Sequence, residues 1–224
     1  MKKSRFQTRI IAFLLGLAGP LACGAAPEPS ADSATLASML EQMRRIEADP
    51  ALNTAAITQG AKVAELCANC HGANGYSKLP ETPNLAGQNP RYLLGQMHKF
   101  ATGQRRYEFM EGLIKAMTPQ ERVSAVLFFA NQQVPTRAPT DVALAAKGKA
   151  YFEKVCFRCH GSNARGGEEY ARLAGQQVPY VTLAVKRYRE NTGDRRKDPV
   201  MADTVKMMSD DDINAVATYV STLP

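Results

Sequence analysis

The sequence predicts an all-α protein that contains two copies of one helical domain, preceded by an extension with a helix of its own. Apolar residues recur at helical spacing along most of the chain, and no segment alternates convincingly as a half-buried strand would. Motifs of residues 58–136 also recur in residues 137–224. With 45% apolar and 22% charged side chains among 224 residues, the chain has ordinary globular composition.

The first segment has the pattern of a secretory signal peptide. Four basic residues precede the apolar run Ile10–Ala22, and small residues suited to cleavage follow it. This run is shorter than the about 20 residues of a membrane-spanning helix, so a multi-span protein is excluded. We assign residues 1–25 to the signal peptide, with an uncleaved anchoring helix as the alternative. Cys23 resembles a bacterial lipoprotein site, and otherwise it is discarded with the signal or left idle beside it.

The extension, residues 26–57, contains one predicted helix, Thr35–Ala48. It has no counterpart in the second copy, and it could cover a cofactor edge or dock a partner. Its large apolar side chains share one side, as an amphipathic helix requires. These side chains are Leu36, Met39, Leu40, Met43 and Ile46.

Each copy is predicted to hold three helices in the same order. The first helix leads into a cysteine pair, the second follows a Leu-Ala-Gly-Gln segment, and the third closes the copy. Two prolines and the absence of apolar periodicity mark Val134–Thr140 as the linker, so we place the domains at residues 58–136 and 137–224. The first and third helices are predicted at Gln59–Cys67 and Pro119–Asn131, and at Val142–Cys156 and Asp210–Ser221.

Four of the five cysteines stand in two Cys-x-x-Cys-His pentads, at residues 67–71 and 156–160. Two such pentads are far beyond chance in a chain with three histidines. Two thiols at this spacing can add to the two vinyl groups of one haem, and the next histidine is then held at an axial position of the iron. We therefore predict two covalently bound haem c groups. The thioether cysteines are Cys67, Cys70, Cys156 and Cys159, and the axial histidines are His71 and His160.

Three other uses of the cysteine pairs are less consistent with the sequence. A structural zinc site lacks a further Cys or His pair that would complete four ligands. A thioredoxin-like redox pair lacks a surrounding βαβ pattern, and simple disulfides leave both histidines unexplained. Each copy offers only about 80 residues, which is small for a stable apolar core, and a buried porphyrin would supply the missing contacts.

Methionines are the candidates for the second axial position of each iron. Met117 and Met208 each precede a predicted N-cap with an acidic residue three positions after it, so we interpret them as helix staples. Met110 and Met201 have no such duty and lie in segments predicted to be irregular. We therefore predict Met110 and Met201 as the second iron ligands, with Met207 as the reserve for the second copy.

The helix after each Leu-Ala-Gly-Gln segment is expected to turn one face toward the haem. In the first copy this face consists of Tyr92, Gln96 and Phe100, and ordinary core packing would use the same face. His98 is the only histidine outside the pentads, and it lies about 200° round the helix from Gln96. We therefore predict that His98 is a surface or hydrogen-bonding residue. Tyr180, Ala184 and Tyr188 form the matching face in the second copy.

From about residue 58 onward, the chain resembles the dihaem cytochrome c4 family. The resemblance covers about three-quarters of the chain and rests on both pentads, both Leu-Ala-Gly-Gln segments, both Gly-x-Arg-Arg segments, Met110 and Met201. It implies two class I-type cytochrome c domains packed with their haems close together. In similar domains a proline carbonyl holds the axial histidine. Pro83 matches this proline, whereas Ala171 stands there in the second copy.

The expected function is electron transport, with no catalytic residues. Because His and Met fill both axial positions, no iron position stays open to a substrate, and positive midpoint potentials are expected. We expect the protein to carry single electrons in a periplasmic respiratory chain, from a quinol-oxidising complex or dehydrogenase to a terminal oxidase or reductase. The alternative is a haem enzyme, or an electron-transfer subunit of one, such as a peroxidase or an oxidoreductase of sulfur compounds.

The charge distribution gives no support to a nucleic-acid partner. The formal charge is +7, but cleavage of the signal would leave 24 basic against 21 acidic residues, and four ionised haem propionates would remove the remaining excess. The second copy is the more basic half. Its basic residues could steer a negatively charged redox partner, or they could be ordinary solvated charges. They are Lys186, Arg187, Arg189, Arg195, Arg196 and Lys197.

Overall fold

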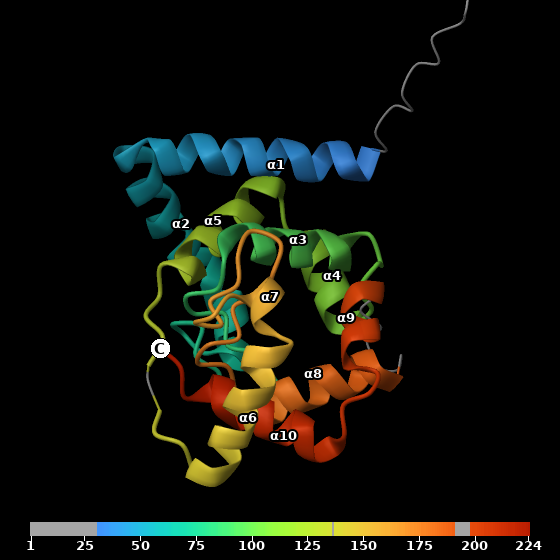
Figure 1. The fold of residues 1–224 in the computed structure, drawn as a ribbon. Coiled ribbons are helices and arrows are strands. Elements are labelled where there is room, and N and C mark those ends of the chain that lie inside the picture. The colour runs from blue at the N-terminus through green and yellow to red at the C-terminus, as the bar shows by residue number, and fades with distance from the viewer. Residues whose placement is uncertain (1–30, 136, 191–197) are drawn as a thin grey trace, which may run out of the picture.

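The computed structural model describes residues 31–135, 137–190 and 198–224, and within these ranges every regular element is a helix. The predicted all-α class is therefore confirmed for the described residues. The signal segment 1–25, with Cys23, and the basic residues 195–197 lie outside them. In Figure 1 the first domain occupies the upper part of the molecule and the second domain the lower part. None of the helices described is both long enough and apolar enough to cross a membrane.

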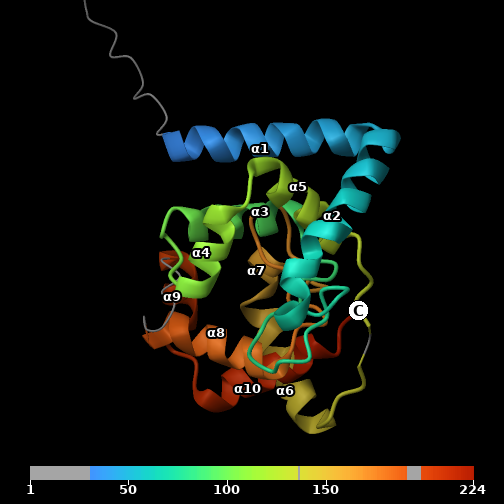
Figure 2. The ribbon, with the colours of Figure 1, turned by 180° about the vertical axis from the view of Figure 1, so that it is seen from behind.

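Helix α1 (Ala31–Ala48) lies across the top of the first domain in both ribbon views (Figures 1 and 2). Met39, Met43 and Ile46 are buried in the same cluster as core residues of α2 (Pro50–His71), α3 (Pro90–Ala101) and α5 (Pro119–Ala130). The helix predicted in the extension is therefore present, and it buries the predicted face. Its apolar contacts make the extension part of the core of the first domain.

Helix α2 (Pro50–His71) begins nine residues before the predicted start at Gln59. Asp49 is its N-cap, and the Asp49 carboxylate accepts hydrogen bonds from the amides of Ala51 and Leu52 at 2.8 and 3.1 Å. Proline at the first helical position has no amide that needs a partner there. The helix runs without a break through residue 58 and ends at the histidine of the first pentad.

The remaining helices follow the same order in both domains. The third predicted helix of each copy is present as α5 and α10, whereas α6 ends two residues before Cys156 and leaves most of the second pentad to a single-turn helix. The first domain contains α3 (Pro90–Ala101), α4 (Glu108–Ala116) and α5 (Pro119–Ala130). The second contains α6 (Val142–Lys154), α7 (Phe157–His160), α8 (Val178–Glu190), α9 (Pro199–Val205) and α10 (Asp210–Ser221).

A glycine lets the first and last helices of each domain cross in close contact. A Cβ atom at Gly60 of α2 would lie 2.0 Å from the Ser124 carbonyl oxygen of α5. A Cβ atom at Gly148 of α6 would lie 1.9 Å from the Ala215 carbonyl oxygen of α10. Both crossings therefore require a residue without a side chain, and they fix the frame on which each pentad is carried.

Both closing helices begin with the predicted capping arrangement. The Thr118 hydroxyl accepts from the Glu121 amide and the Glu121 carboxylate accepts from the Thr118 amide, and Ser209 and Asp212 repeat this capping box. Met117 and Met208 precede these caps and are buried. Their predicted role as packing residues at the helix starts is confirmed.

Candidate haem sites

The first pentad occupies the last turns of α2, which carries Cys67, Cys70 and His71 together. Both thiols are free, with Cys67 half-buried and Cys70 exposed. Burial raises the pKa of the Cys67 thiol to about 11. Cys67 therefore lacks the lowered thiol pKa that is typical of the reactive cysteine of a Cys-x-x-Cys redox site.

The second pentad has the same residues but a different backbone. Cys156 is the N-cap of α7, and the helix contains Cys159 and His160. Burial raises the pKa of the Cys156 thiol to about 11, as it does in the first domain. Cys159 is exposed, and both thiols are free.

Each pentad histidine is held by a backbone carbonyl through Nδ1. His71 Nδ1 lies 2.9 Å from the Pro83 oxygen, and His160 Nδ1 lies 2.8 Å from the Ala171 oxygen. Ala171 thus supplies the same contact as Pro83. Desolvation by burial lowers the pKa of both imidazoles, which favours their neutral form.

These residues fit a covalently attached haem in each domain. When Nδ1 carries the proton and donates to a carbonyl, the lone pair of the neutral ring is on Nε2, the atom available to bind a metal. The two free thiols of each pentad stand at the spacing that thioether attachment uses. The donor set in each domain is therefore two thiols and one oriented imidazole.

Met110 and Met201 lie in short helices, so the expectation of irregular segments around them was wrong. Met110 is in α4 and packs against the apolar cluster that includes Phe100 and Ile114. Met201 is in α9, where its amide donates to the N-cap Asp198 at 3.0 Å, and its side chain packs against the core of the second domain. Of these two helices, only α9 has a side-chain cap, because the N-cap residue of α4, Tyr107, makes no side-chain capping hydrogen bond.

The reserve ligand Met207 and the remaining histidine have other environments. The Met207 side chain is 84% exposed, whereas Met201 is half-buried. His98 is buried on α3, so it is not a surface residue, and it takes part in a polar or ring interaction. Of the two roles predicted for His98, the surface role was wrong, and the hydrogen-bonding role stays a prediction.

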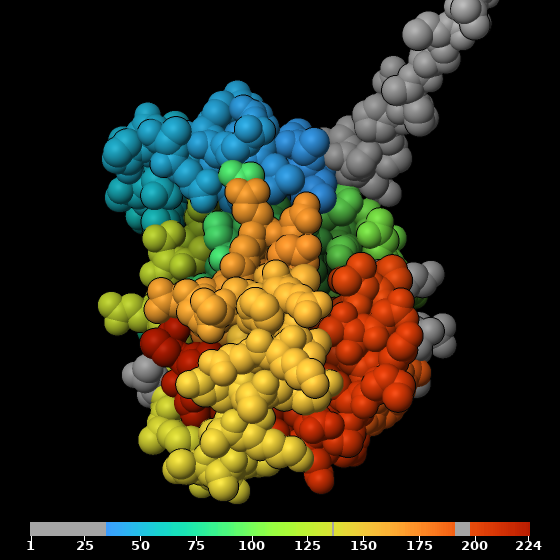
Figure 3. Space-filling view, in the orientation of Figure 1, coloured from blue at the N-terminus to red at the C-terminus, as the bar shows by residue number. Residues whose placement is uncertain are grey.

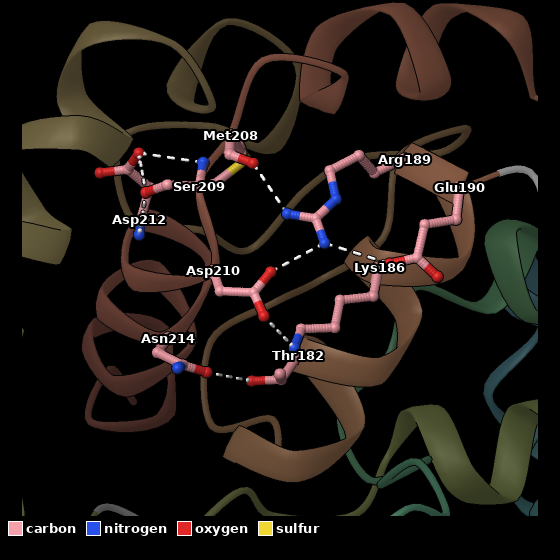
Figure 4. Close-up of polar contacts among 9 residues, drawn as sticks. All are labelled: Thr182, Lys186, Arg189, Glu190, Met208, Ser209, Asp210, Asp212 and Asn214. Atoms are coloured by element: carbon pink, nitrogen blue, oxygen red, sulfur yellow. Dashed lines mark hydrogen bonds and ion pairs between the residues drawn. The ribbon is translucent and has the colours of Figure 1, made fainter.

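Polar contacts tie α8 to the start of α10, the helix that follows α9 (Figure 4). The Arg189 guanidinium donates to the Met208 carbonyl oxygen at 2.9 Å and pairs with Asp210 at 2.7 Å. Lys186 Nζ contacts Asp210 at 2.6 Å. Lys186 and Arg189, two of the basic residues that could steer a redox partner, therefore have a structural role, and Asp210 partly neutralises their charges.

The two domains meet through the Leu-Ala-Gly-Gln segments and the loops beside them. Glycines 87 and 175 have positive φ angles, and the Val134 side chain of the linker lies against both. The loop after α7, orange in Figure 3, reaches over the first domain. There Glu168 forms an ion pair with Arg91 at 3.1 Å. The sequence repeat marked these segments, but it carried no signal that they form an interface.

Comparison with known proteins agrees with this architecture. The model of the cytochrome c family, described as "Cytochrome c", matches residues 57–135 and again residues 145–224. Cytochrome c4 of Pseudomonas aeruginosa is 33% identical over 175 residues, covering 73% of this chain and 87% of that protein. A thiosulfate dehydrogenase electron acceptor of Thiomonas intermedia is 32% identical over 176 residues, covering 72% and 80%.

A solved structure shows the same fold. Reduced recombinant cytochrome c4 from Pseudomonas stutzeri superposes with a TM-score of 0.67 and 27% identity, covering 74% of this chain and 97% of that one. The repeated family match, and a structural match that spans 97% of the solved chain, both require two consecutive cytochrome c domains. The chain therefore belongs to the cytochrome c family, within it to the dihaem cytochromes c4, and its cofactors are two covalently bound haem c groups.

Proposed function

We propose that this dihaem cytochrome carries single electrons between periplasmic redox proteins, with each haem iron bound by one histidine and one methionine. The axial pairs would be His71 with Met110 and His160 with Met201. The observation that carries the proposal is the repeated donor set, in which each pentad has two free thiols and a histidine fixed through Nδ1. When bound, each haem supplies a one-electron iron couple.

The protein's own residues would favour electron transfer over catalysis. The carbonyl of Pro83 or Ala171 keeps the imidazole in one orientation, so the nitrogen ligand does not have to reorganise between redox states. A methionine that stays in place leaves no coordination position for a substrate. Partly buried packing of Met110 and Met201 supports this role, because their side chains are already confined by neighbouring apolar residues.

The ligand assignment is tested by the near-infrared charge-transfer band of methionine-bound ferric haem. We expect Met110→Ala and Met201→Ala each to remove about half of the band and to open one haem to cyanide or carbon monoxide. Met207→Ala is the matched control, because this side chain is exposed, and it should leave the band intact. Loss of band intensity only in the control, or ready ligand binding by the unmodified holoprotein, would contradict the proposal.

A periplasmic dehydrogenase is a suitable electron donor. The similarity to a thiosulfate dehydrogenase electron acceptor supports this class of donor, and a quinol-oxidising complex is the other class. The acceptor would be a terminal oxidase or reductase. Mixing the oxidised cytochrome with a purified thiosulfate dehydrogenase and thiosulfate tests the first class by stopped-flow spectroscopy. Reduction within the enzyme's turnover time is expected, and no enzyme-dependent reduction would exclude this donor.

Periplasmic location is proposed from the signal pattern of residues 1–25. Mass spectrometry of the mature protein gives the cleavage site and any modification of Cys23 in one measurement. A mature N-terminus at Cys23 with added lipid mass would place the protein on a membrane surface. An unmodified N-terminus after Cys23 would make it a soluble periplasmic carrier, and an uncleaved chain would contradict the signal peptide and favour the anchoring helix instead.

A further inference from the structure

The carbonyl that holds His71 belongs to a peptide group that the second domain holds from its other side. His71 Nδ1 lies 2.9 Å from the Pro83 oxygen. The amide of Asn84 is the N–H of that same planar peptide group, and it donates to Oε1 of Gln176 at 2.8 Å. A glutamine of the second domain is thus linked to the histidine of the first domain through one peptide bond.

The second domain shows the same arrangement with the domains exchanged. His160 Nδ1 lies 2.8 Å from the Ala171 oxygen, and the N–H of this peptide group is the Arg172 amide. This amide donates to Oε1 of Gln88, in the first domain, at 2.6 Å. Gln88 and Gln176 are the glutamines of the two Leu-Ala-Gly-Gln segments, so the repeat explains why the contact is reciprocal.

Both glutamine side chains are fixed by further hydrogen bonds. Gln176 Nε2 donates to the Asn84 oxygen at 3.1 Å, and Gln88 Nε2 donates to the Arg172 oxygen at 2.9 Å. Each side chain therefore pairs with both the N–H and the C=O of one residue across the interface. Both glutamines are about 6% exposed, so water competes weakly for these bonds.

We propose that Gln176 and Gln88 are positioning residues that each tune the haem of the opposite domain. A glutamine oxygen that accepts from the peptide N–H polarises the peptide, and its carbonyl becomes a better acceptor for imidazole Nδ1–H. The imidazole then donates more electron density through Nε2, which favours the ferric state. The inference rests on the proposed axial role of His71 and His160, and it makes domain packing a determinant of both potentials.

The decisive experiment is the substitution Gln176→Met, which keeps the side-chain size and removes the acceptor. We expect the first-domain potential to rise, with at least about a threefold change in the reduction equilibrium constant, or about 28 mV at 59 mV per tenfold change. The second-domain potential should stay in place. A redox titration monitored by NMR measures the two haem potentials separately, because the NMR signals of residues 67–71 report on the first domain and those of residues 156–160 on the second. Exchange of the His71 Nδ1–H with solvent in the reduced protein should also become faster.

The neighbouring Gln177 provides a matched control across the same interface. Gln177 Nε2 donates to the carbonyl oxygens of Leu79 and Thr82, at 2.9 and 2.8 Å, and not to the peptide that holds His71. Gln177→Met should leave the first-domain potential and the exchange of the His71 proton unchanged. A shift by Gln177→Met equal to that by Gln176→Met would overturn the inference, since it would show general loosening of the interface.

Two more variants keep the test decisive if Gln176→Met does not accumulate as holoprotein. Gln176→Glu retains an acceptor oxygen, so the first-domain potential should stay at or below its original value, and a rise would refute the mechanism. Gln88→Met should raise only the second-domain potential, with Asn89→Ala as its control. If the charge-transfer bands are intact but neither glutamine variant changes the potential of the haem in the opposite domain, this inference alone is overturned. Absence of the band in the unmodified protein overturns the proposed ligation instead.

Discussion

The substitution Gly60→Ala tests whether close contact between the first and last helices sets the stability of the first domain. The added Cβ atom would lie 2.0 Å from the Ser124 oxygen and 2.8 Å from the Phe128 Cβ atom. Ordinary van der Waals contact begins at 3.4 Å, so α2 and α5 would have to move apart by about 1.4 Å. The Ser124 oxygen is a backbone atom and the Phe128 Cβ is fixed by the backbone, so rotation of a side chain cannot relieve the contact.

Two opposing effects decide the expected magnitude. Alanine is favoured over glycine inside a helix by about 1 kcal/mol. Overpacking that forces backbone shifts costs about 1–3 kcal/mol, and contact with a carbonyl oxygen belongs at the upper end. We therefore expect Gly60→Ala to lower the free energy of unfolding by about 2 kcal/mol, and Gly148→Ala to do the same in the second domain.

Urea unfolding of the holoprotein, followed by far-ultraviolet circular dichroism, measures this loss. A midpoint about 1 M lower is expected for Gly60→Ala, given a slope of about 2 kcal/mol per M. Gly95→Ala is the matched control, because no atom lies within 4 Å of the added Cβ on α3. It should stabilise the protein by about 0.5–1 kcal/mol. Equal stabilisation by both variants would show that α2 and α5 are not in the close contact at Gly60 that the structure gives.

Three further predictions concern caps, charge and backbone strain, all measured by urea unfolding. Ser209→Ala removes the N-cap of α10 and should cost about 1 kcal/mol. Hydrogen bonds, first of all from Lys186, lower the pKa of Asp210 below its usual 3.8. This carboxylate therefore stabilises the fold above about pH 4, and the stabilisation is lost as the pH falls through the lowered pKa. Asp210→Asn should flatten the dependence of the unfolding free energy on pH, and an unchanged dependence would contradict this role of Asp210. Gly175→Ala should cost about 1 kcal/mol or more because φ is +74°, and Val134→Ala added to it should recover only the steric part.

Most of the local structure could be predicted because its signals lie within a few residues of one another. The capping boxes at Thr118 and Ser209 are examples, since each hydroxyl and its acidic partner stand three positions apart. The early start of α2 had a local signal as well, in Asp49 followed by proline, but weak apolar periodicity before Gln59 hid it. Short helices α4 and α9 were missed because they have too few turns for periodicity to appear.

The contacts between domains could not be predicted, because their partners are distant in the sequence. Gln88 and Arg172 are 84 residues apart, and Asn84 and Gln176 are 92 apart. Nothing in a glutamine within a repeated segment tells whether its amide faces its own domain or the neighbouring one. The repeat could still have suggested reciprocity, since two copies of one motif that meet at an interface tend to contact each other in the same way.

The difference between Pro83 and Ala171 makes the two crossed contacts unequal. The proline ring fixes φ at residue 83, so the peptide group that holds His71 is restrained by its own chain as well as by Gln176. Ala171 has no such restraint, and the orientation of its peptide group depends more heavily on Gln88. Gln88→Met should therefore shift the second-domain potential more than Gln176→Met shifts the first. Adding Pro83→Ala to Gln176→Met should enlarge the first-domain shift, and an unchanged shift would show that the proline ring has no part in holding the histidine.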